Sequence, residues 1–188
     1  MADPPAPDET DPPQPSAPRA ALVSVRPGAI VLARHGEPAL SRKCFLTSDQ
    51  YRDWWAKYEV GGLRAGQTPP PELLATAEGA GAIYASTRPR AQETAAAIAA
   101  GREVMSDALF IEAPLPPPRF PSWFKLPPKY WGVVARIWWH AFNHHEGQET
   151  RREAECRAEK AAQALIARAE SGQDVLVLAH GYFNHMVG

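Results

Sequence analysis

The stretch VLARHGEPAL at residues 31–40 joins an apolar run directly to a cluster of polar groups. The apolar run begins slightly earlier, as AIVLA at 29–33, and is short and uniform enough for a fully buried strand. Arg34, His35, Gly36 and Glu37 follow it without a break. Taken alone, these residues allow two interpretations. One is a strand exit with charged side chains in water, and the other is an anion-binding site that contains a reactive histidine.

The rest of the chain alternates between helical and strand patterns. Uniformly apolar strands that alternate with helices are typical of a parallel sheet covered on both faces. We therefore predict an α/β fold, a three-layer sandwich with a mostly parallel central sheet flanked by helices. The expected strands are 29–33, 82–86, 108–116 and 174–180, and the expected helices are 47–60, 69–80, 89–101, 129–142 and 149–172.

Composition narrows the classes of function. A length of 188 residues suits one domain. The net charge of -1 and the pI near 6.6 argue against a nucleic-acid partner. Cys44 and Cys156 follow no metal or redox spacing. Because no secretory signal and no apolar run long enough to span a bilayer are evident, we expect a cytoplasmic protein, and the oligomeric state is left open.

The chain divides into a tail and one domain. Residues 1–24 are rich in Pro, Asp and Ala, so we expect a disordered tail. Residues 25–188 would form the folded domain, with an aromatic insertion at about 116–146. The chain ends in HGYFNHMVG, where a helix should begin. We therefore expect the sequence to be truncated, with the C-terminal part of the fold missing.

Polar side chains that could take part in chemistry lie in each predicted strand or directly after it. His35 follows the first strand, Arg88 and Arg90 lie just beyond the second, Glu112 lies in the third, and His180 ends the fourth. Ligands of parallel α/β sheets bind at the carboxyl ends of the strands, so these groups are expected to share one crevice.

The chemistry of this set fits phosphoryl transfer. Arginine binds phosphate oxygens with a planar, permanently charged fork. Neutral imidazole is a nucleophile at pH 7, and a carboxyl group can hand a proton to a departing alkoxide.

RHGE at 34–37, ASTRPRAQETA at 85–95, Glu112 and VLVLAHG at 175–181 together resemble the histidine phosphatase superfamily, with its phosphoglycerate-mutase-like fold. The resemblance implies a two-step phosphoryl transfer that needs no metal and no cofactor. By motif, it assigns His35 as the nucleophile that becomes phosphorylated. It places Arg34, Arg90 and His180 in the phosphate pocket, and Glu112 as the acid and base. A small-molecule phosphomonoester is then the expected partner.

The sequence leaves the roles of several polar residues near these motifs open. Arg90 precedes alanine, as the family pattern requires, whereas Arg88 is either a second substrate contact or a surface residue. Ser86 and Thr87 are interpreted as caps of the following helix rather than as substrate contacts. Ser41 and Arg42 follow RHGE where relatives place further phosphate contacts, so both are candidates.

Alternatives remain for the function and for the aromatic segment. A phosphomonoesterase is favoured over a phosphoglycerate-mutase-type phosphotransferase, a phosphoprotein phosphatase or a non-catalytic phosphate-binding module. Metal binding by the histidines at 140–145 is not favoured, since no further ligands complete the set. We interpret the tryptophans of the insertion as packing of a cap, with a membrane-surface helix or a wall for an apolar substrate as alternatives.

Overall fold

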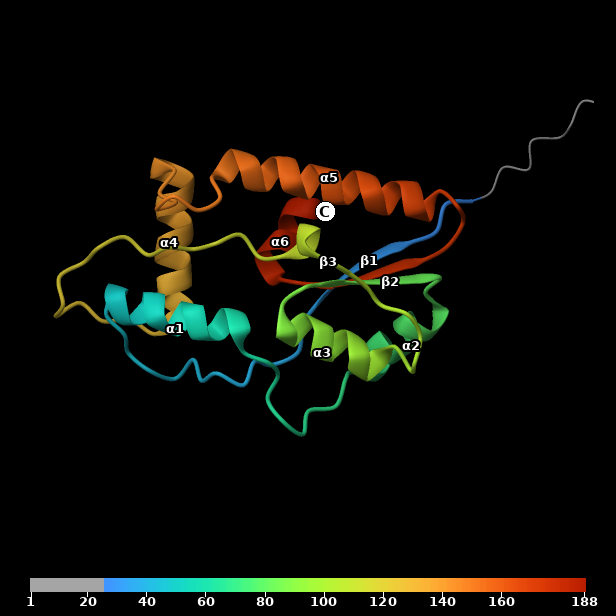
Figure 1. Cartoon of the computed structure of the whole chain (residues 1–188), viewed down its shortest axis with the longest axis horizontal. Coiled ribbons are helices and arrows are strands. Elements are labelled where there is room, and N and C mark those ends of the chain that lie inside the picture. Colours follow the sequence, from blue (N-terminus) through green and yellow to red (C-terminus); the bar gives the residue numbers. More distant parts are fainter. Residues whose placement is uncertain (1–25) are drawn as a thin grey trace, which may run out of the picture.

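The computed structural model describes residues 26–188, so the tail predicted at 1–24 lies outside the described residues. Four parallel strands form one sheet in the order β1-β4-β2-β3 (Figure 1). They are β1 (Ile30–Arg34), β2 (Ala82–Ser86), β3 (Met105–Asp107) and β4 (Val175–Ala179). The two central strands, β2 and β4, are almost completely buried, as their uniformly apolar sequences require.

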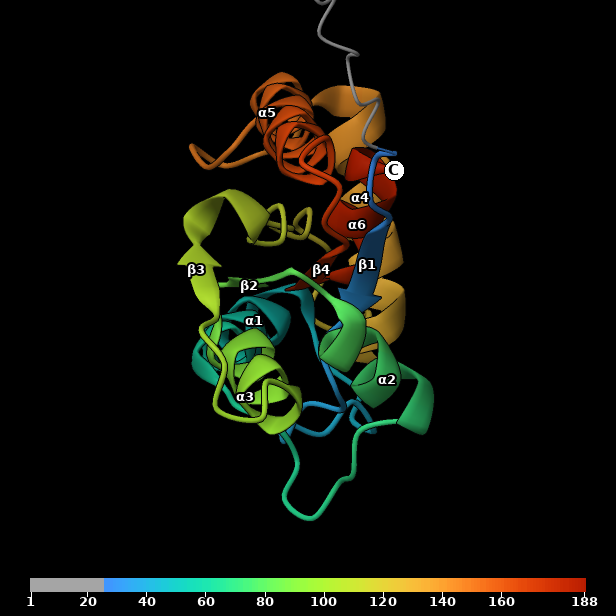
Figure 2. The same ribbon diagram turned by 90° about the vertical axis from the view of Figure 1, so that its right-hand side faces the viewer.

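Helices cover both faces of this sheet, which confirms the predicted three-layer α/β fold. Parallel neighbours need crossover connections, and these connections supply the outer layers. One face carries α2 (Pro71–Gly79) and α3 (Pro89–Ile98), which pack on Ile83 and Leu176. The other carries α5 (Arg151–Ala169) and α6 (Gly181–Val187), which pack on Val175 and Val177. The edge-on view in Figure 2 separates the three layers.

Two more helices, α1 (Ser48–Val60) and α4 (Pro128–Phe142), lie beyond the carboxyl ends of the strands (Figure 1). We call this pair the cap. Thr47 and Gln50 form a reciprocal capping box that starts α1. Pro128 occupies the first turn of α4, where its missing N–H costs nothing, and Asn143 ends that helix in a left-handed conformation. The segment predicted as an aromatic insertion, about 116–146, contains α4.

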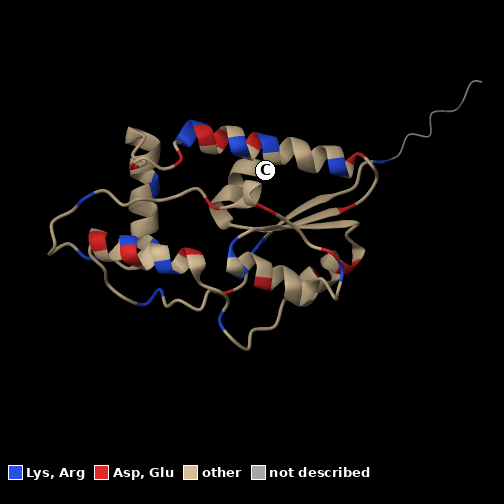
Figure 3. Cartoon of the chain, in the orientation of Figure 1, with Lys and Arg blue, Asp and Glu red and all other residues tan. Residues whose placement is uncertain are grey.

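Aromatic side chains hold the cap together. Tyr51 and Trp54 of α1 pack with Trp131 of α4, and all three rings are at most 9 % exposed. Trp131 is fully buried, and its indole N–H donates to the carbonyl oxygen of Leu46 at 2.6 Å. Figure 3 shows that charges of both signs are mixed along α5, whereas α4 carries few. The packing of Trp131 against α1 supports the interpretation of this tryptophan as the core of a cap, whereas Trp123 is exposed and Trp139 packs with Ala113 and Ala154. None of the helices within residues 26–188 combines the length and apolar character needed to cross a membrane.

The predicted third strand, 108–116, is wrong. β3 ends at Asp107, and residues 108–110 form a short 3-10 helix instead. The Asp107 carboxylate accepts from the backbone N–H of Leu109 at 2.8 Å, which turns the chain out of the sheet. The carbonyl oxygens of Leu109 and Ile111 accept from the guanidinium of Arg157 rather than from a neighbouring strand. Glu112 therefore lies in a loop that Arg157 anchors to α5.

The contribution of Trp131 to the packing of the cap can be measured by mutation. Trp131→Ala should lower the free energy of unfolding by about 3–5 kcal/mol, because it removes a fully buried ring and leaves a cavity. Trp123→Ala is the matched control. That ring is 79 % exposed, so the loss should stay below about 0.5 kcal/mol. Urea unfolding followed by circular dichroism measures both. Equal losses for the two variants would contradict the packing described here.

Candidate active site

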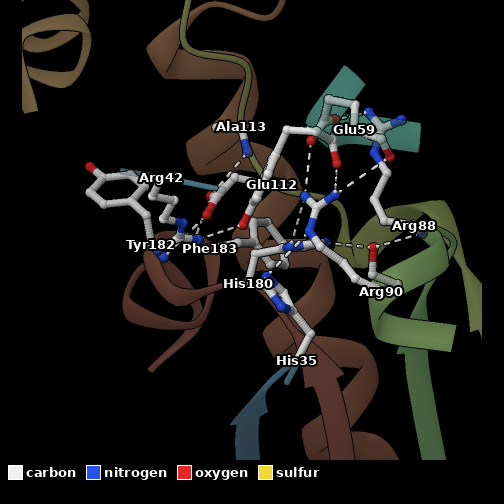
Figure 4. Close-up of polar contacts among 12 residues, drawn as sticks. His35, Arg42, Glu59, Arg88, Arg90, Glu112, Ala113, His180, Tyr182 and Phe183 are labelled. Carbon is white, nitrogen blue, oxygen red and sulfur yellow. Dashed lines mark hydrogen bonds and ion pairs between the residues drawn. The ribbon is translucent and has the colours of Figure 1, made fainter. Parts of the chain in front are cut away.

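Two histidines meet at the carboxyl ends of β1 and β4. The strands pair with Arg34 opposite Ala179, so the next residue on each strand is a histidine. The backbone N–H of His35 donates to the carbonyl oxygen of Ala179 at 3.1 Å. The ring centroids of His35 and His180 lie 5.2 Å apart, and the two residues are only 6 % and 1 % exposed. Figure 4 shows the two side chains among the polar groups of the site.

The hydrogen bonds of His35 define its tautomer. Its Nδ1 lies 2.8 Å from the carbonyl oxygen of Gly36. A carbonyl can only accept, so Nδ1 carries the proton and Nε2 keeps its lone pair. Arg90 donates from its Nε to this Nε2 at 3.3 Å. The free nitrogen of His35 therefore points to a guanidinium, where an anionic ligand would also bind.

The surroundings keep His35 neutral. Burial lowers the pKa of its imidazole from 6.5 to about 4, and the nearby charges of Arg90, Arg34 and Arg42 act in the same direction. The hydrogen bond to Gly36 opposes this shift only in part. The imidazole of His35 consequently stays unprotonated throughout the neutral pH range.

Gly36 leaves room for the side chain of Gln67, which packs against its loop. A Cβ at this position would lie 2.7 Å from Oε1 of Gln67, which itself accepts from the backbone N–H of Glu37 at 2.8 Å. The backbone N–H of Gly36 donates to the hydroxyl of Thr94 on α3 at 3.0 Å. The loop that carries His35 is thus fixed from two sides.

Ser86 orients His180. Its hydroxyl lies 2.9 Å from Nε2 of His180, while Nδ1 of the same ring lies 3.4 Å from Arg90. Ser86 also accepts from the backbone N–H of Arg88 at 3.3 Å. The expected capping role for Ser86 and Thr87 is wrong, because α3 begins after Arg88 with no side-chain cap. Burial and the charge of Arg90 lower the pKa of His180, so this ring is also neutral.

Arg90 is a completely buried guanidinium at the first turn of α3. Besides the two histidines, it donates to the carbonyl oxygen of Tyr58 at 2.8 Å and to Oε1 of Glu59 at 2.9 Å. Its guanidinium carbon also lies 4.2 Å from the centre of the Tyr58 ring. The structure thus brings Arg90 to the histidines, as the sequence motif predicts.

Glu59 is a residue that the sequence did not single out. Its second carboxylate oxygen pairs with Arg88, so one carboxylate holds both arginines. Glu59 lies in the last turn of α1, among other charged residues that are typical of a solvent-exposed helix face. The sequence therefore carries no signal for its contact with the two arginines. Arg88 faces Glu59 and not the histidines.

Glu112 lies beside the first turn of α6. Its two oxygens accept from the backbone N–H groups of Ala113, Tyr182 and Phe183 at 3.1 to 3.3 Å. The guanidinium of Arg136, from α4, lies 3.8 Å from Oε1. Burial raises the pKa of the carboxyl group, and Arg136 and the backbone donors oppose this shift. Glu112 is therefore a carboxyl group that holds its proton to higher pH than an exposed glutamate does.

A cavity of about 480 Å³ joins these groups. Six of the candidate site residues line it, namely Arg34, His35, Arg42, Arg90, Glu112 and His180. The cap supplies its walls, and two further cationic residues of the lining, Lys129 and Arg136, come from α4. Arg136 was missed because it lies inside an aromatic helical segment with no motif around it.

Two predicted substrate contacts lie elsewhere. Ser41 lines a separate surface cavity, where its hydroxyl accepts from the backbone N–H of Lys43. Arg88 lines a neighbouring cavity on the far side of Glu59. The structure does not bring either side chain into the cavity that holds the histidines.

The histidines considered as metal ligands have other contacts. His140 lies 2.5 Å from the hydroxyl of Tyr182, and His145 lies 3.1 Å from the carbonyl oxygen of Gln148. Within residues 26–188, the side chains form no group of three or more His, Cys, Asp or Glu that could hold a metal ion.

Solved structures share the fold. A functionally characterised open reading frame product of Mycobacterium tuberculosis is 22% identical, with a TM-score of 0.55 over 86% of this chain and 78% of that chain. A mycobacterial glucosyl-3-phosphoglycerate phosphatase, solved with vanadate, is 21% identical, with a TM-score of 0.52 over 84% and 78%. At these identities the likeness shows the fold alone. A search of curated proteins by sequence gave no significant match.

A family description covers more than half of the chain. The model of the histidine phosphatase superfamily (branch 1) matches residues 71–187, which include Arg90, Glu112 and His180. His35 lies before the matched segment, but β1 places it directly beside His180. The chain therefore belongs to the histidine phosphatase superfamily.

Proposed function

We propose that this protein is a metal-independent phosphomonoester hydrolase that acts through a phosphohistidine on His35. The observation that carries the proposal is the state of that side chain. His35 is neutral, its Nδ1 is tied to the Gly36 carbonyl, and its Nε2 faces Arg90 in an open cavity. These properties give a nucleophile for phosphorus a free lone pair, a fixed orientation and access to the substrate.

In the first step, Nε2 of His35 attacks phosphorus while the ester P–O bond breaks on the opposite side. The lone pair of Nε2 forms the new N–P bond, and the bonding pair of the ester leaves with the alkoxide oxygen. The hydrogen bond to Gly36 favours this step, since the developing imidazolium keeps its Nδ1 proton against a carbonyl oxygen.

Positive side chains would stabilise the transferring group. Arg34 and Arg90 line the cavity beside the nucleophile, and each carries a fork that matches phosphate oxygens. His180 lies beside His35, with its Nδ1 3.4 Å from Nη2 of Arg90. Phosphoryl transfer depends mainly on positioning and on charge stabilisation, so this set supplies what the reaction needs.

Glu112 would act first as an acid and then as a base. In its protonated form it gives a proton to the departing alkoxide. Its carboxylate then takes a proton from water as the water oxygen attacks phosphorus and the N–P bond breaks. The products are the alcohol and inorganic phosphate, and both His35 and Glu112 return to their starting states. The raised pKa of Glu112 suits the first of these steps.

The nucleophile is tested by trapping. Wild-type protein, freed of metal with EDTA and mixed with a radiolabelled phosphomonoester, should carry an acid-labile, base-stable label on His35. His35→Ala should abolish the label and reduce kcat by at least about 10³-fold, because the covalent route is lost. His185→Ala, a change of a histidine outside the cavity, is the control and should keep both. A strict metal requirement, or full activity in His35→Ala, would refute the mechanism.

The acid is tested by pH dependence and by leaving group. His35 must be unprotonated, so kcat/KM should fall as the pH drops through about 4. Glu112 must be protonated, so kcat/KM should also fall as the pH rises through its raised pKa. Glu112→Gln should lose the high-pH limb. It should also slow alkyl phosphates by about 10²–10⁴-fold but aryl phosphates much less, since aryl oxides leave without a proton.

The control for this test is Glu159→Gln, which alters an exposed carboxylate on α5. It should keep the wild-type profile. If Glu112→Gln retains the high-pH limb, or slows alkyl and aryl phosphates equally, the role assigned to Glu112 is wrong.

A further inference from the structure

The cavity above the histidines carries more positive charge than one phosphoryl group requires. One carboxylate, Glu112, lines it, and burial weakens the ionisation of that group. In the proposed function the phosphoryl group uses Arg34 and Arg90. The remaining cationic side chains of the lining are Arg42, Lys129 and Arg136.

Arg136 is the most constrained of these cations. Its side chain is 14% exposed, and its guanidinium carbon lies over the Tyr182 ring, 3.4 Å from the ring centre. Its only anionic neighbour among residues 26–188 is Glu112, at 3.8 Å. Its Nη1 is buried and has no hydrogen-bond partner in the described part of the chain. A buried guanidinium with an unused donor is stabilised when an anion binds beside it.

The walls around Arg136 are apolar. Val133 and Ile137 lie on the same face of α4 and are 51% and 53% exposed, although both are aliphatic. The aromatic residues Trp54 and Trp55 line the cavity from α1. A volume of about 480 Å³ is far more than a phosphate group fills and is typical of sites for small organic ligands.

We infer that Arg136 forms a second anion subsite, and that the substrate is the phosphate monoester of an apolar alcohol that bears a second acidic group. The phosphoryl group would lie against His35 and Arg90. The apolar body of the substrate would lie between α1 and α4, with its acidic group at Arg136. This inference rests on the proposed function, since it identifies the leaving alcohol of that reaction.

A different role for Arg136 must be separated from this one. Arg136 lies 3.8 Å from Glu112, so the alternative is that it positions this acid and does not contact the substrate. A positioning residue affects all substrates alike, whereas a subsite affects only substrates that carry the second acid. The ratio of two matched substrates therefore distinguishes the roles.

The test compares 4-carboxyphenyl phosphate with its neutral isostere, 4-carbamoylphenyl phosphate. In the wild type, kcat/KM should favour the carboxylate by roughly tenfold or more, the value of one charge-assisted hydrogen bond. In Arg136→Gln this ratio should fall to about one, and Arg136→Lys should restore part of it. Arg152→Gln, which removes an exposed charge from α5, should keep the wild-type ratio.

Two outcomes would overturn the subsite. The first is a wild-type ratio of kcat/KM near one for the two esters. This result would exclude the subsite without any variant, so it holds even if Arg136→Gln does not fold. A loss in Arg136→Gln that is equal for both substrates would show that Arg136 acts through Glu112 alone.

Binding separates failure of the subsite from failure of the proposed hydrolysis. In the His35→Ala protein, tryptophan fluorescence should report dissociation constants for the two esters that differ by roughly tenfold, since the subsite does not need the nucleophile. Equal dissociation constants would overturn the subsite. The proposed hydrolysis would be refuted separately, by a lack of turnover of any phosphomonoester by the wild type.

Discussion

The buried guanidinium of Arg90 is the interaction on which the rest of this site depends. A permanently charged group with no exposure to solvent must find its partners inside the protein. Arg90 finds them on three elements: α1 supplies Glu59 and the carbonyl of Tyr58, and the loops after β1 and β4 supply the two histidines. One side chain therefore joins the cap to the sheet at the point where the proposed chemistry occurs.

The pKa values of the histidines and of Glu112 shift in opposite directions, and different causes produce the two shifts. Arg90 helps to lower the pKa of His35 and of His180, so both rings stay neutral. A neutral ring does not repel the guanidinium and keeps a lone pair for phosphorus. Glu112 lies where burial outweighs its backbone donors and Arg136, so its pKa rises. The site thus holds an unprotonated nucleophile and a carboxyl group with a raised pKa at the same pH, which is the pairing that the proposed first step requires.

The sequence predicts the parts of this arrangement that follow from strand ends. Parallel strands place their carboxyl ends on one edge, so His35, His180 and Arg90 could be expected together, and the structure brings them together. The third strand was misplaced. The apolar segment at 109–111 packs against α5, and two of its carbonyl oxygens accept hydrogen bonds from Arg157 instead of from a neighbouring strand. Glu59 and Arg136 could not be found either. Both lie on cap helices, and their roles depend on how the cap docks, which no local pattern encodes.

The proposed chemistry depends on a neutral His35 with a free Nε2, and nitrogen-15 NMR of the imidazoles reports both the protonation state and the tautomer of this ring. Comparison of wild type with His35→Ala assigns the ring signals of His35. At pH 6 we expect the ring of His35 to be neutral, with its proton on Nδ1 and no proton on Nε2. An imidazolium at that pH, or a neutral ring with its proton on Nε2, would contradict this expectation.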